Sequence, residues 1–314
     1  MNVPGCVKYG FLLGLLLCLT SPGCRRRETW HTSTLLFFDT VCELKVSAPE
    51  PLFTSAQQGV SQTFSEIEAL FSPGASLADP LVDQLFLQSY DVYLKSEGHF
   101  DISVAPLSWL WGFRSRSYKV PDEAEIQKTL RRVGLNRIKP SPEGLVVPAG
   151  MELDWGGIAK GFGIDRAVQR LREDHISHGF LNAGGDLFCW GKNPDGADWK
   201  IGIQHPRKGG FLGILTLSDM GAATTGDYQR FFIEDDRRYH HVFDPKTGYP
   251  AEGKQSVTVV GPKTLLCDAL STALFVSSDP ERVLASYPDY GAVLVNNNGA
   301  VTTIGKVFPF ILEP

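Results

Sequence analysis

The sequence predicts an α+β fold, and the first evidence is a series of strand signals. Cys42, Leu44 and Val46 alternate with polar residues, which is the two-residue period of a half-buried strand. Further strand signals lie at residues 211–217, 229–234 and 256–260. Residues 292–295 and 301–304 flank the stretch Asn-Asn-Asn-Gly, so the sequence predicts a hairpin near its end.

Helix signals are the second observation behind this fold class. Apolar residues at helical spacing mark one helix face early in the chain and another in its middle, at Val60, Phe64, Ile67 and Phe71 and at Ile158, Phe162, Val168 and Leu171. Residues 267–274 form an apolar run that predicts a buried or half-buried helix. The polar stretch 114–125 predicts a surface loop near the functional site.

Composition is the third observation, and it suits a globular enzyme. Hydrophobic residues make up 43% of the 314 residues, charged residues 21%, and the formal charge is −5. A chain of this size and balance predicts one large domain and gives no sign of nucleic-acid binding. Cys42, Cys189 and Cys267 have no metal spacing and form no disulfide framework, so we expect them to be buried free thiols.

The N-terminus predicts export. An apolar run at residues 11–19 has the length of a signal peptide and is followed by Ser-Pro-Gly-Cys. We expect residues 1–23 to be a lipoprotein-type signal peptide, Cys24 to be acylated, and residues 24–33 to tether a catalytic domain at residues 34–314. The protein would then lie on a bacterial membrane, facing the periplasm. An uncleaved anchor and a simple signal peptide are the alternatives.

The segment 154–161, Asp-Trp-Gly-Gly-Ile-Ala-Lys-Gly, is the most informative motif. Its glycines expose backbone N–H groups at the start of a predicted helix, with Asp154 and Lys160 on either side. Such a helix start favours a phosphate or pyrophosphate group. The alternative is that the glycines serve only a tight turn or close packing.

A second pattern lies on the predicted helix at residues 267–274. Asp268 and Thr272 are four residues apart and therefore share a helix face. Their oxygens are hard ligands of the kind that Mg²⁺ or Ca²⁺ takes, and a glycine carbonyl would add a third. The alternative is that Asp268 caps a helix and Thr272 is only packed.

A third pattern is the histidine pair His240 and His241, which stands where a predicted strand ends in a turn containing Pro245, Gly248 and Pro250. A histidine there can act as a general base or acid near neutral pH. A purely local hydrogen bond that stabilises the turn is the alternative.

Taken in order, these segments resemble the ApbE family of FAD:protein FMN transferases. The resemblance covers nearly all of the mature chain and rests on several long motifs. They are Phe38-Asp39-Thr40, the segment 98–107 with Leu-Trp-Gly-Phe at 110–113, the segments 154–161, 182–186 and 224–228, the His241 turn and the Asp268 helix. The resemblance implies two lobes of mixed sheets with flanking helices and a flavin nucleotide site between them.

The resemblance also implies an activity. Such enzymes split the pyrophosphate of FAD with a divalent cation, here expected to be Mg²⁺, and join FMN to a Ser or Thr of a flavoprotein, releasing AMP. The expected acceptor is a subunit of a membrane or exported redox complex. A pyrophosphatase that hydrolyses FAD and a non-catalytic FAD-binding lipoprotein are the alternatives.

Site residues follow from the matching motifs. The resemblance makes His241 the general base and Asp268 both a catalytic residue and a metal ligand. The other metal ligands are the Gly157 carbonyl, Thr272 and Ser271. The nucleotide contacts would come from Phe38, Phe71, His99, Phe100, Asp101, Asp154, Lys160 and Val242. Asp186 and Asp227 are interpreted as structural or supporting residues.

The chain departs from the family pattern at two places. Phe71 takes the place of a tyrosine, and the Glu and Asn that usually follow are missing from residues 70–79. A phenylalanine keeps an aromatic face but loses the hydroxyl hydrogen bond. Phe38-Asp39-Thr40 replaces the usual Met-Gly-Thr, which puts a charge where glycine is common.

Overall fold

The computed structural model describes residues 1, 29–72 and 74–313. Residues 2–23 of the expected signal peptide and residues 24–28 of the expected tether, Cys24 among them, therefore lie outside the described residues. Strand β1 (Trp30–Phe37) begins inside the expected tether, before the expected start of the domain at residue 34. Within the described part, no helix combines the length and the apolar character that crossing a bilayer requires.

An eight-stranded antiparallel sheet forms the centre of the molecule, with the order β1-β2-β5-β6-β9-β12-β13-β14. Its strands are β1 (Trp30–Phe37), β2 (Thr40–Ser47), β5 (Gly179–Ala183), β6 (Asp186–Trp190), β9 (Met220–Gly226), β12 (Lys254–Gly261), β13 (Gly291–Asn296) and β14 (Val301–Gly305). Cys42, Leu44 and Val46 are fully buried in β2, which confirms the strand predicted from their alternation.

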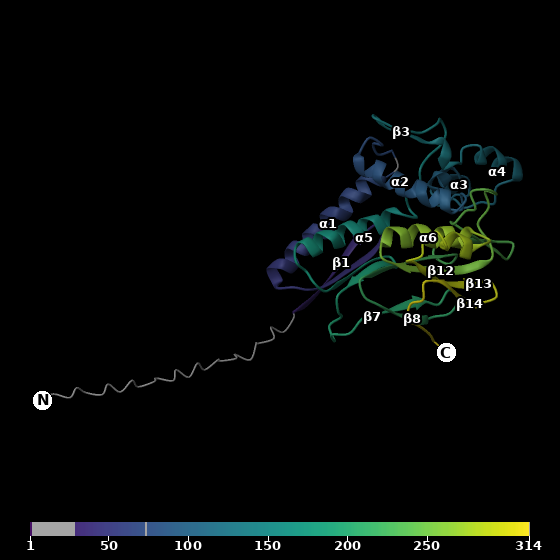
Figure 1. The fold of residues 1–314 in the computed structure, drawn as a ribbon. Coiled ribbons are helices and arrows are strands. Elements are labelled where there is room, and N and C mark those ends of the chain that lie inside the picture. The colour runs from purple at the N-terminus through teal and green to yellow at the C-terminus, as the bar shows by residue number, and fades with distance from the viewer. Residues whose placement is uncertain (2–28, 73, 314) are drawn as a thin grey trace.

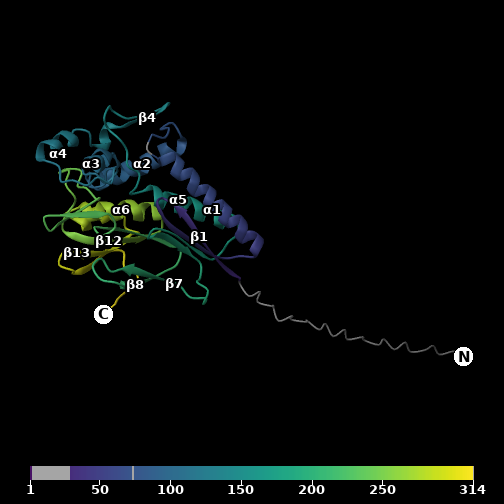
Figure 2. The same ribbon diagram turned by 180° about the vertical axis from the view of Figure 1, so that it is seen from behind.

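Helices cover one face of this sheet and a smaller sheet covers the other (Figure 1). The covering helices are α1 (Glu50–Phe71), α5 (Ala159–Glu173) and α6 (Thr264–Val276), with the short α7 (Pro280–Leu284) after α6. The opposite layer is a three-stranded sheet with the order β15-β8-β7, made of Phe310–Leu312, Phe211–Leu217 and Trp199–Gln204. The reverse view shows the same layers, with β7 and β8 below the central sheet (Figure 2).

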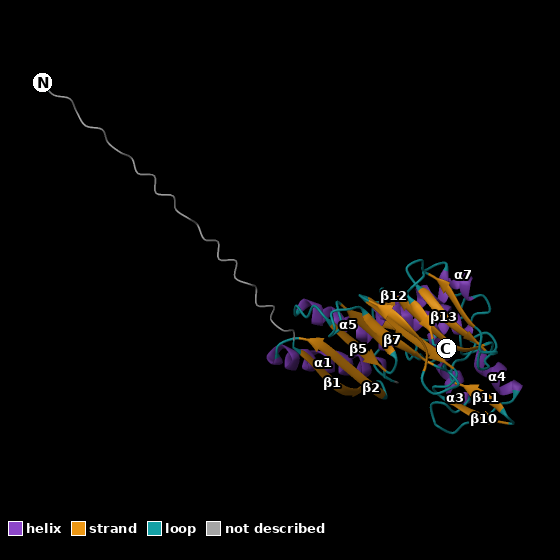
Figure 3. Cartoon of the chain, turned by 90° about the horizontal axis from the view of Figure 1, so that it is seen from below, coloured by secondary structure: helices purple, strands orange, loops and turns teal. Residues whose placement is uncertain are grey.

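A second lobe lies over α6, on the side away from the central sheet (Figure 1). Seen from below, part of this lobe extends to one side of the sheets (Figure 3). It contains α2 (Pro80–Lys95), η1 (Ile102–Val104), α3 (Ala105–Leu110), α4 (Glu123–Leu130), η2 (Leu135–Arg137) and the hairpins β3-β4 (Lys139–Ser141, Gly144–Val146) and β10-β11 (Phe231–Glu234, Arg237–His240). Leu107, Trp111, Phe113, Ile126 and Phe243 form a core of its own there. The predicted α+β class and its two-lobed arrangement with flanking helices are confirmed.

Two predicted elements have different ends from those expected. The predicted loop 114–125 ends early because Asp122 and Glu125 form a capping box that starts α4 at Glu123. The predicted strand 229–234 begins only at Phe231, since Gln229 and Arg230 lie in a bend and line a cavity instead.

The hairpin of β1 and β2 explains the departure at Phe38 and Asp39. Both residues have positive φ angles, 55° and 54°, in a two-residue turn between Phe37 and Thr40. A turn with two positive φ angles favours glycine or aspartate, so Asp39 fits where relatives have glycine. The N–H of Phe38 donates to the carboxylate of Glu68 in α1, which holds the turn against that helix.

Other predictions from the sequence are confirmed. The hairpin near the end joins β13 to β14, and the N–H of Asn296 donates to the carbonyl of Ala300 across its turn at 2.9 Å. Cys42, Cys189 and Cys267 are buried free thiols.

Candidate active site

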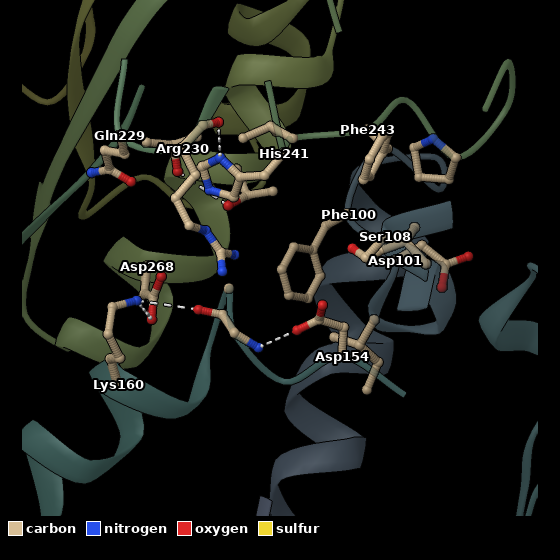
Figure 4. A pocket seen from close by; sticks show the side chains of 18 of the residues that line it. Phe100, Asp101, Ser108, Asp154, Lys160, Gln229, Arg230, His241, Phe243 and Asp268 are labelled. Carbon is tan, nitrogen blue, oxygen red and sulfur yellow. Dashed lines mark hydrogen bonds and ion pairs between the residues drawn. The ribbon is translucent and has the colours of Figure 1, made fainter. Parts of the chain in front are cut away.

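A cavity of about 150 Å³ lies between the two lobes. Its walls come from the segment before α3, the glycine segment 154–161, α6, the end of β9 and the turn after β11 (Figure 4). The structure brings together ten of the residues predicted for the site. They are His99, Phe100, Asp101, Asp154, Gly157, Lys160, His241, Val242, Asp268 and Thr272.

Lys160 joins two buried carboxylates at one side of the cavity. Its Nζ lies 2.8 Å from Oδ2 of Asp186 and 3.5 Å from Oδ2 of Asp268. Burial opposes the lysine charge, but the two carboxylates together raise the pKa of Lys160. Burial, and then the charge of Asp186, raise the pKa of Asp268 even though Lys160 opposes the shift. Asp186, interpreted from sequence as a supporting residue, thus lines the cavity itself.

Asp268 and Asp165 cap each other's helices. The N–H of Gly161 at the start of α5 donates to Oδ2 of Asp268 at 3.2 Å. In return, Asp165 in α5 accepts from the N–H groups of Thr264 and Leu265 at the start of α6, at 2.8 and 3.0 Å. Part of the α5 start, expected to offer bare N–H groups to a phosphate, is therefore satisfied by Asp268.

Hydroxyl groups gather beside Asp268. Oγ1 of Thr225 lies 3.1 Å from Oγ1 of Thr272 and 2.7 Å from Oγ of Ser271. The hydroxyl of Ser271 donates to the carbonyl of Asp268 in the preceding turn of α6, and Ser271 is buried behind the cavity lining. A Cβ placed on Gly157 would lie 3.4 Å from the Thr272 hydroxyl, an ordinary contact distance, so the glycine segment packs directly beside α6.

These oxygens form a hard donor set with a single carboxylate. Among the described residues, no group of three His, Cys, Asp or Glu side chains stands together as a metal centre. A cation that keeps several waters and substrate oxygens needs only one or two carboxylates, so the set suits Mg²⁺ better than a caged metal. The ammonium of Lys160 beside Asp268 shows that this position favours a positive charge.

Asp154 and Asp101 have different surroundings. Asp154 forms an ion pair with Arg114 at 3.1 Å and accepts the N–H of Gly156 at 2.9 Å, so it fixes the glycine segment. Asp101 is buried, and it accepts from the N–H and hydroxyl of Ser103 and from the N–H of Leu135. Its oxygens have partners inside the protein although Asp101 lines the cavity, so its contact with a nucleotide stays a prediction.

Two histidines are held in defined tautomers. The Nδ1–H of His99 donates to the carbonyl of Ser96 at 2.7 Å, which leaves Nε2 to accept from Lys246 at 3.1 Å. The Nδ1–H of His241 donates to the carbonyl of Arg230 at 3.2 Å and leaves its Nε2 without a proton. Burial, then the charge of Arg230 and the neighbouring His240, lower the pKa of His241 to about 3, so its imidazole is neutral at physiological pH.

Arg230 is a cavity residue that the sequence motifs did not reveal. Its side chain points into the cavity between His241 and Lys160 (Figure 4). In the sequence, Arg230 lies two residues after the segment 224–228 and inside the predicted strand 229–234, which gives no sign of a site residue. An arginine here supplies a fork of donors for phosphate oxygens.

An aromatic cluster supports the turn that carries His241. The indole N–H of the fully buried Trp111 donates to the carbonyl of Gly248 at 3.0 Å. Tyr239 and Phe243 pack on Trp111 with ring centroids 5.5 and 6.1 Å away. The Leu-Trp-Gly-Phe motif thus holds the predicted turn in place through Trp111.

Phe38 and Phe71 are not among the residues that line the cavity. Phe38 packs edge to face on Phe64, at 5.0 Å between ring centroids. Phe71 packs on Trp155 and Phe162 at 5.0 and 6.2 Å. Both rings contribute to the core beneath the glycine segment, so their contact with a flavin nucleotide stays a prediction.

Comparison with known proteins agrees with this arrangement. The family model of the ApbE family matches residues 38–294. The FAD:protein FMN transferase of Haemophilus influenzae is 32% identical over 232 residues, which is 69% of this chain and 67% of that protein. The FAD:protein FMN transferase of Treponema pallidum is 30% identical over 328 residues, covering 92% of this chain and 90% of that protein.

Solved structures show the same fold. The ApbE protein of Thermotoga maritima superposes with a TM-score of 0.81 at 29% identity, covering 88% of this chain and 97% of its own. The flavinyl transferase ApbE of Pseudomonas stutzeri gives a TM-score of 0.78 at 25% identity, covering 88% and 95%. On the family match and the long alignments, this chain belongs to the ApbE family.

Proposed function

We propose that this protein is a metal-dependent FAD:protein FMN transferase that modifies a Ser or Thr hydroxyl of a partner protein. The observation that carries the proposal is the placing of a neutral His241 and Arg230 in one cavity with Lys160, Asp268 and Thr272. A base and a cluster of phosphate and cation ligands are the parts that phosphoryl transfer needs.

His241 acts as the general base in this proposal. The acceptor hydroxyl oxygen attacks the phosphorus of the FMN half of FAD, and a new P–O bond forms while the P–O bond to AMP breaks. The hydroxyl proton passes to Nε2 of His241, and AMP leaves. Since Nδ1 of His241 already donates to the Arg230 carbonyl, only Nε2 is free to accept this proton.

Arg230 and Lys160 bind the pyrophosphate oxygens. Both are cationic cavity residues, and Lys160 keeps its charge because two carboxylates raise its pKa. Their charges offset the negative charge of the phosphates before and during transfer. Phe100 and Val242 supply apolar contacts at the same cavity.

The divalent cation, expected to be Mg²⁺, would be held by Asp268, Thr272 and the Gly157 carbonyl, with Ser271 supporting Thr272 through Thr225. When bound, it would neutralise charge on the phosphoryl oxygens. A Lys160 that moves from Asp268 towards the phosphates would leave the carboxylate free to bind the cation.

The partner and location are part of the proposal. We infer a flavoprotein subunit of a membrane or exported redox complex as the acceptor, and a periplasm-facing protein attached to the membrane through a lipid on Cys24. The signal-like N-terminus of the sequence supports this. Mass spectrometry of the membrane-extracted chain tests it, since acylation would add a lipid mass to an N-terminal Cys24.

The activity is tested by incubating the protein with FAD, Mg²⁺ and a flavoprotein subunit that bears an acceptor Thr. We expect the subunit to gain the mass of FMN as AMP is released, and both products to disappear when a chelator is added. AMP without the mass gain would mean hydrolysis of FAD by water. FAD binding with neither product would mean a storage protein, and either result would overturn the transferase.

A further inference from the structure

A second and larger cavity lies beside the candidate active site. Its volume is about 510 Å³, and it runs between the central sheet and the three-stranded sheet. One wall comes from β2, β5, β9 and β12, and the other from β7 and β8. We call this cavity the β7 groove, because all six residues of β7, Trp199–Gln204, line it.

We propose that the β7 groove binds an extended segment of the acceptor polypeptide and leads its Ser or Thr hydroxyl to the candidate active site. This inference rests on the proposed transferase function, because only that reaction needs a polypeptide substrate. It adds the place and the conformation in which the substrate binds.

The first argument is that β7 is an edge strand. It pairs with β8 along its whole length, and no strand of residues 29–72 or 74–313 pairs with its other side. A free strand edge offers a row of backbone donors and acceptors to another chain. Six residues of strand extend roughly 20 Å, enough to hold an extended peptide by strand addition.

The second argument is that β7 lacks most of the features that keep edge strands from pairing with another chain. Its sequence, Trp-Lys-Ile-Gly-Ile-Gln, contains one charge and no proline. Gly202 leaves room for the ring of Phe211, which a Cβ at this position would meet at 2.5 Å. Phe211 is 61% exposed, so a large apolar side chain stands at the groove without cover.

The third argument is that the groove and the candidate active site are continuous. Gly184, Thr224 and Gln229 line both cavities. The amide of Gln229 donates to the carbonyl of Thr224 at 3.2 Å, which fixes the boundary between them. A chain in the groove therefore passes next to Arg230 and His241.

The fourth argument is that the end of the groove near the active site is rigid. Arg207, three residues after β7, forms two hydrogen bonds with Asp227 at 2.7 and 2.6 Å. Asp227 follows β9 and precedes Gln229, so this pair ties the end of β7 to the boundary segment. At the other end, Phe180 stacks on Trp199 with ring centroids 5.6 Å apart. The ion pair with Arg207 explains the structural role that the sequence predicts for Asp227.

The test uses the full chain with FAD, Mg²⁺ and a library of short synthetic peptides that each carry one threonine. Wild-type protein selects the best acceptor by mass gain. The variants Phe211→Ala and Lys200→Ala remove side chains of the groove wall, and Ile311→Ala on β15 is the matched control. Ile311 is 70% exposed on the opposite edge of the same sheet.

We expect Phe211→Ala to raise the KM for the peptide about tenfold, as the loss of an aromatic anchor at an interface does, and Lys200→Ala to raise it less. The Kd for FAD and the kcat should stay at the wild-type values, and Ile311→Ala should match wild type throughout. Hydrogen exchange adds a direct readout, since adding the peptide should slow exchange of β7 amides while FAD alone should not.

Several outcomes would overturn the inference. Groove variants that weaken FAD binding instead would show that the groove takes part of the donor nucleotide. A change in oligomeric state would show an interface between copies of this chain. Equal peptide KM values for all variants would remove the groove while leaving the transferase intact. A wild-type protein that modifies no peptide and no protein would remove both proposals together.

Discussion

The two walls of the candidate active site are held in different ways. The wall built from α5 and α6, with Lys160, Gly161 and Asp268, is fixed by ion pairs and by hydrogen bonds between segments about a hundred residues apart. The opposite wall carries His241 and is fixed by packing of aromatic rings around Trp111. The first arrangement sets charges, and the second sets the position of one neutral base.

Among the proposed variants, Asp268→Ala on the charged wall should reduce activity the most. We expect flavin transfer to fall by at least about a thousandfold, since loss of a bound cation removes several kcal/mol of charge stabilisation. The fold should persist at a cost of about 1–3 kcal/mol, because the Gly161 N–H loses its acceptor while Lys160 keeps its ion pair with Asp186. Transfer kinetics and thermal unfolding check both.

The matched control is Asp219→Asn, which changes an exposed carboxylate paired with Arg172. Its activity should equal that of wild type. Metal-dependent transfer that continues at the wild-type rate in Asp268→Ala would remove Asp268 from the metal site.

His241→Gln tests the aromatic wall by removing the proposed base. We expect kcat to fall about 10²- to 10⁴-fold, which is the usual contribution of a general base. Metal and FAD binding should be unchanged, because no ligand of the charged wall is altered. His175→Asn, a change at an exposed histidine with positive φ, is the control.

The pH dependence of stability tests the low pKa of His241. His241 has a pKa of about 3 in the folded protein, against about 6.5 in an unfolded chain. Between these values the unfolded state binds more protons, so His241 lowers stability there and the free energy of unfolding rises with pH. His241→Gln should make that rise less steep, as measured by urea unfolding at several pH values. An unchanged slope would contradict the low pKa.

Trp111→Phe tests whether the rings alone hold the aromatic wall. The substitution keeps a ring but leaves the buried carbonyl of Gly248 without its donor, at a cost of about 1–3 kcal/mol of stability. We expect kcat to fall several-fold through displacement of the His241 turn. Trp109→Phe is the control, because its exposed indole donates to Glu152 at the surface.

Asp165→Ala gives the smallest effect and tests the charged wall from its far side. Asp165 accepts two N–H groups at the start of α6, so its loss should cost about 1–2 kcal/mol, as for other helix caps. Asp279→Ala removes a single exposed bond at the start of α7 and should cost less. Equal losses of unfolding free energy in the two variants, measured by urea unfolding, would show that the buried cap stabilises the protein no more than the exposed one.

The sequence predicted the charged wall better than the aromatic wall. The four-residue spacing of Asp268 and Thr272 places them on one helix face, and the family resemblance added Lys160 to the same site. Arg230 lies in a bend just before a strand, where no periodic pattern shows the direction of a side chain. Phe71 is a different case, because its motif position predicts a nucleotide contact, which stays a prediction, while its half-buried ring packs beside Trp155.

The exchange of caps between α5 and α6 restricts how this protein can vary. Asp165 belongs to α5 but completes α6, and Asp268 belongs to α6 but completes α5. Neither helix is therefore an independent module that could be transplanted from a relative. A chimera that imported α5 with another residue at 165 would weaken α6 and move Ser271 and Thr272 away from Thr225, so recombination within the family must carry both segments together.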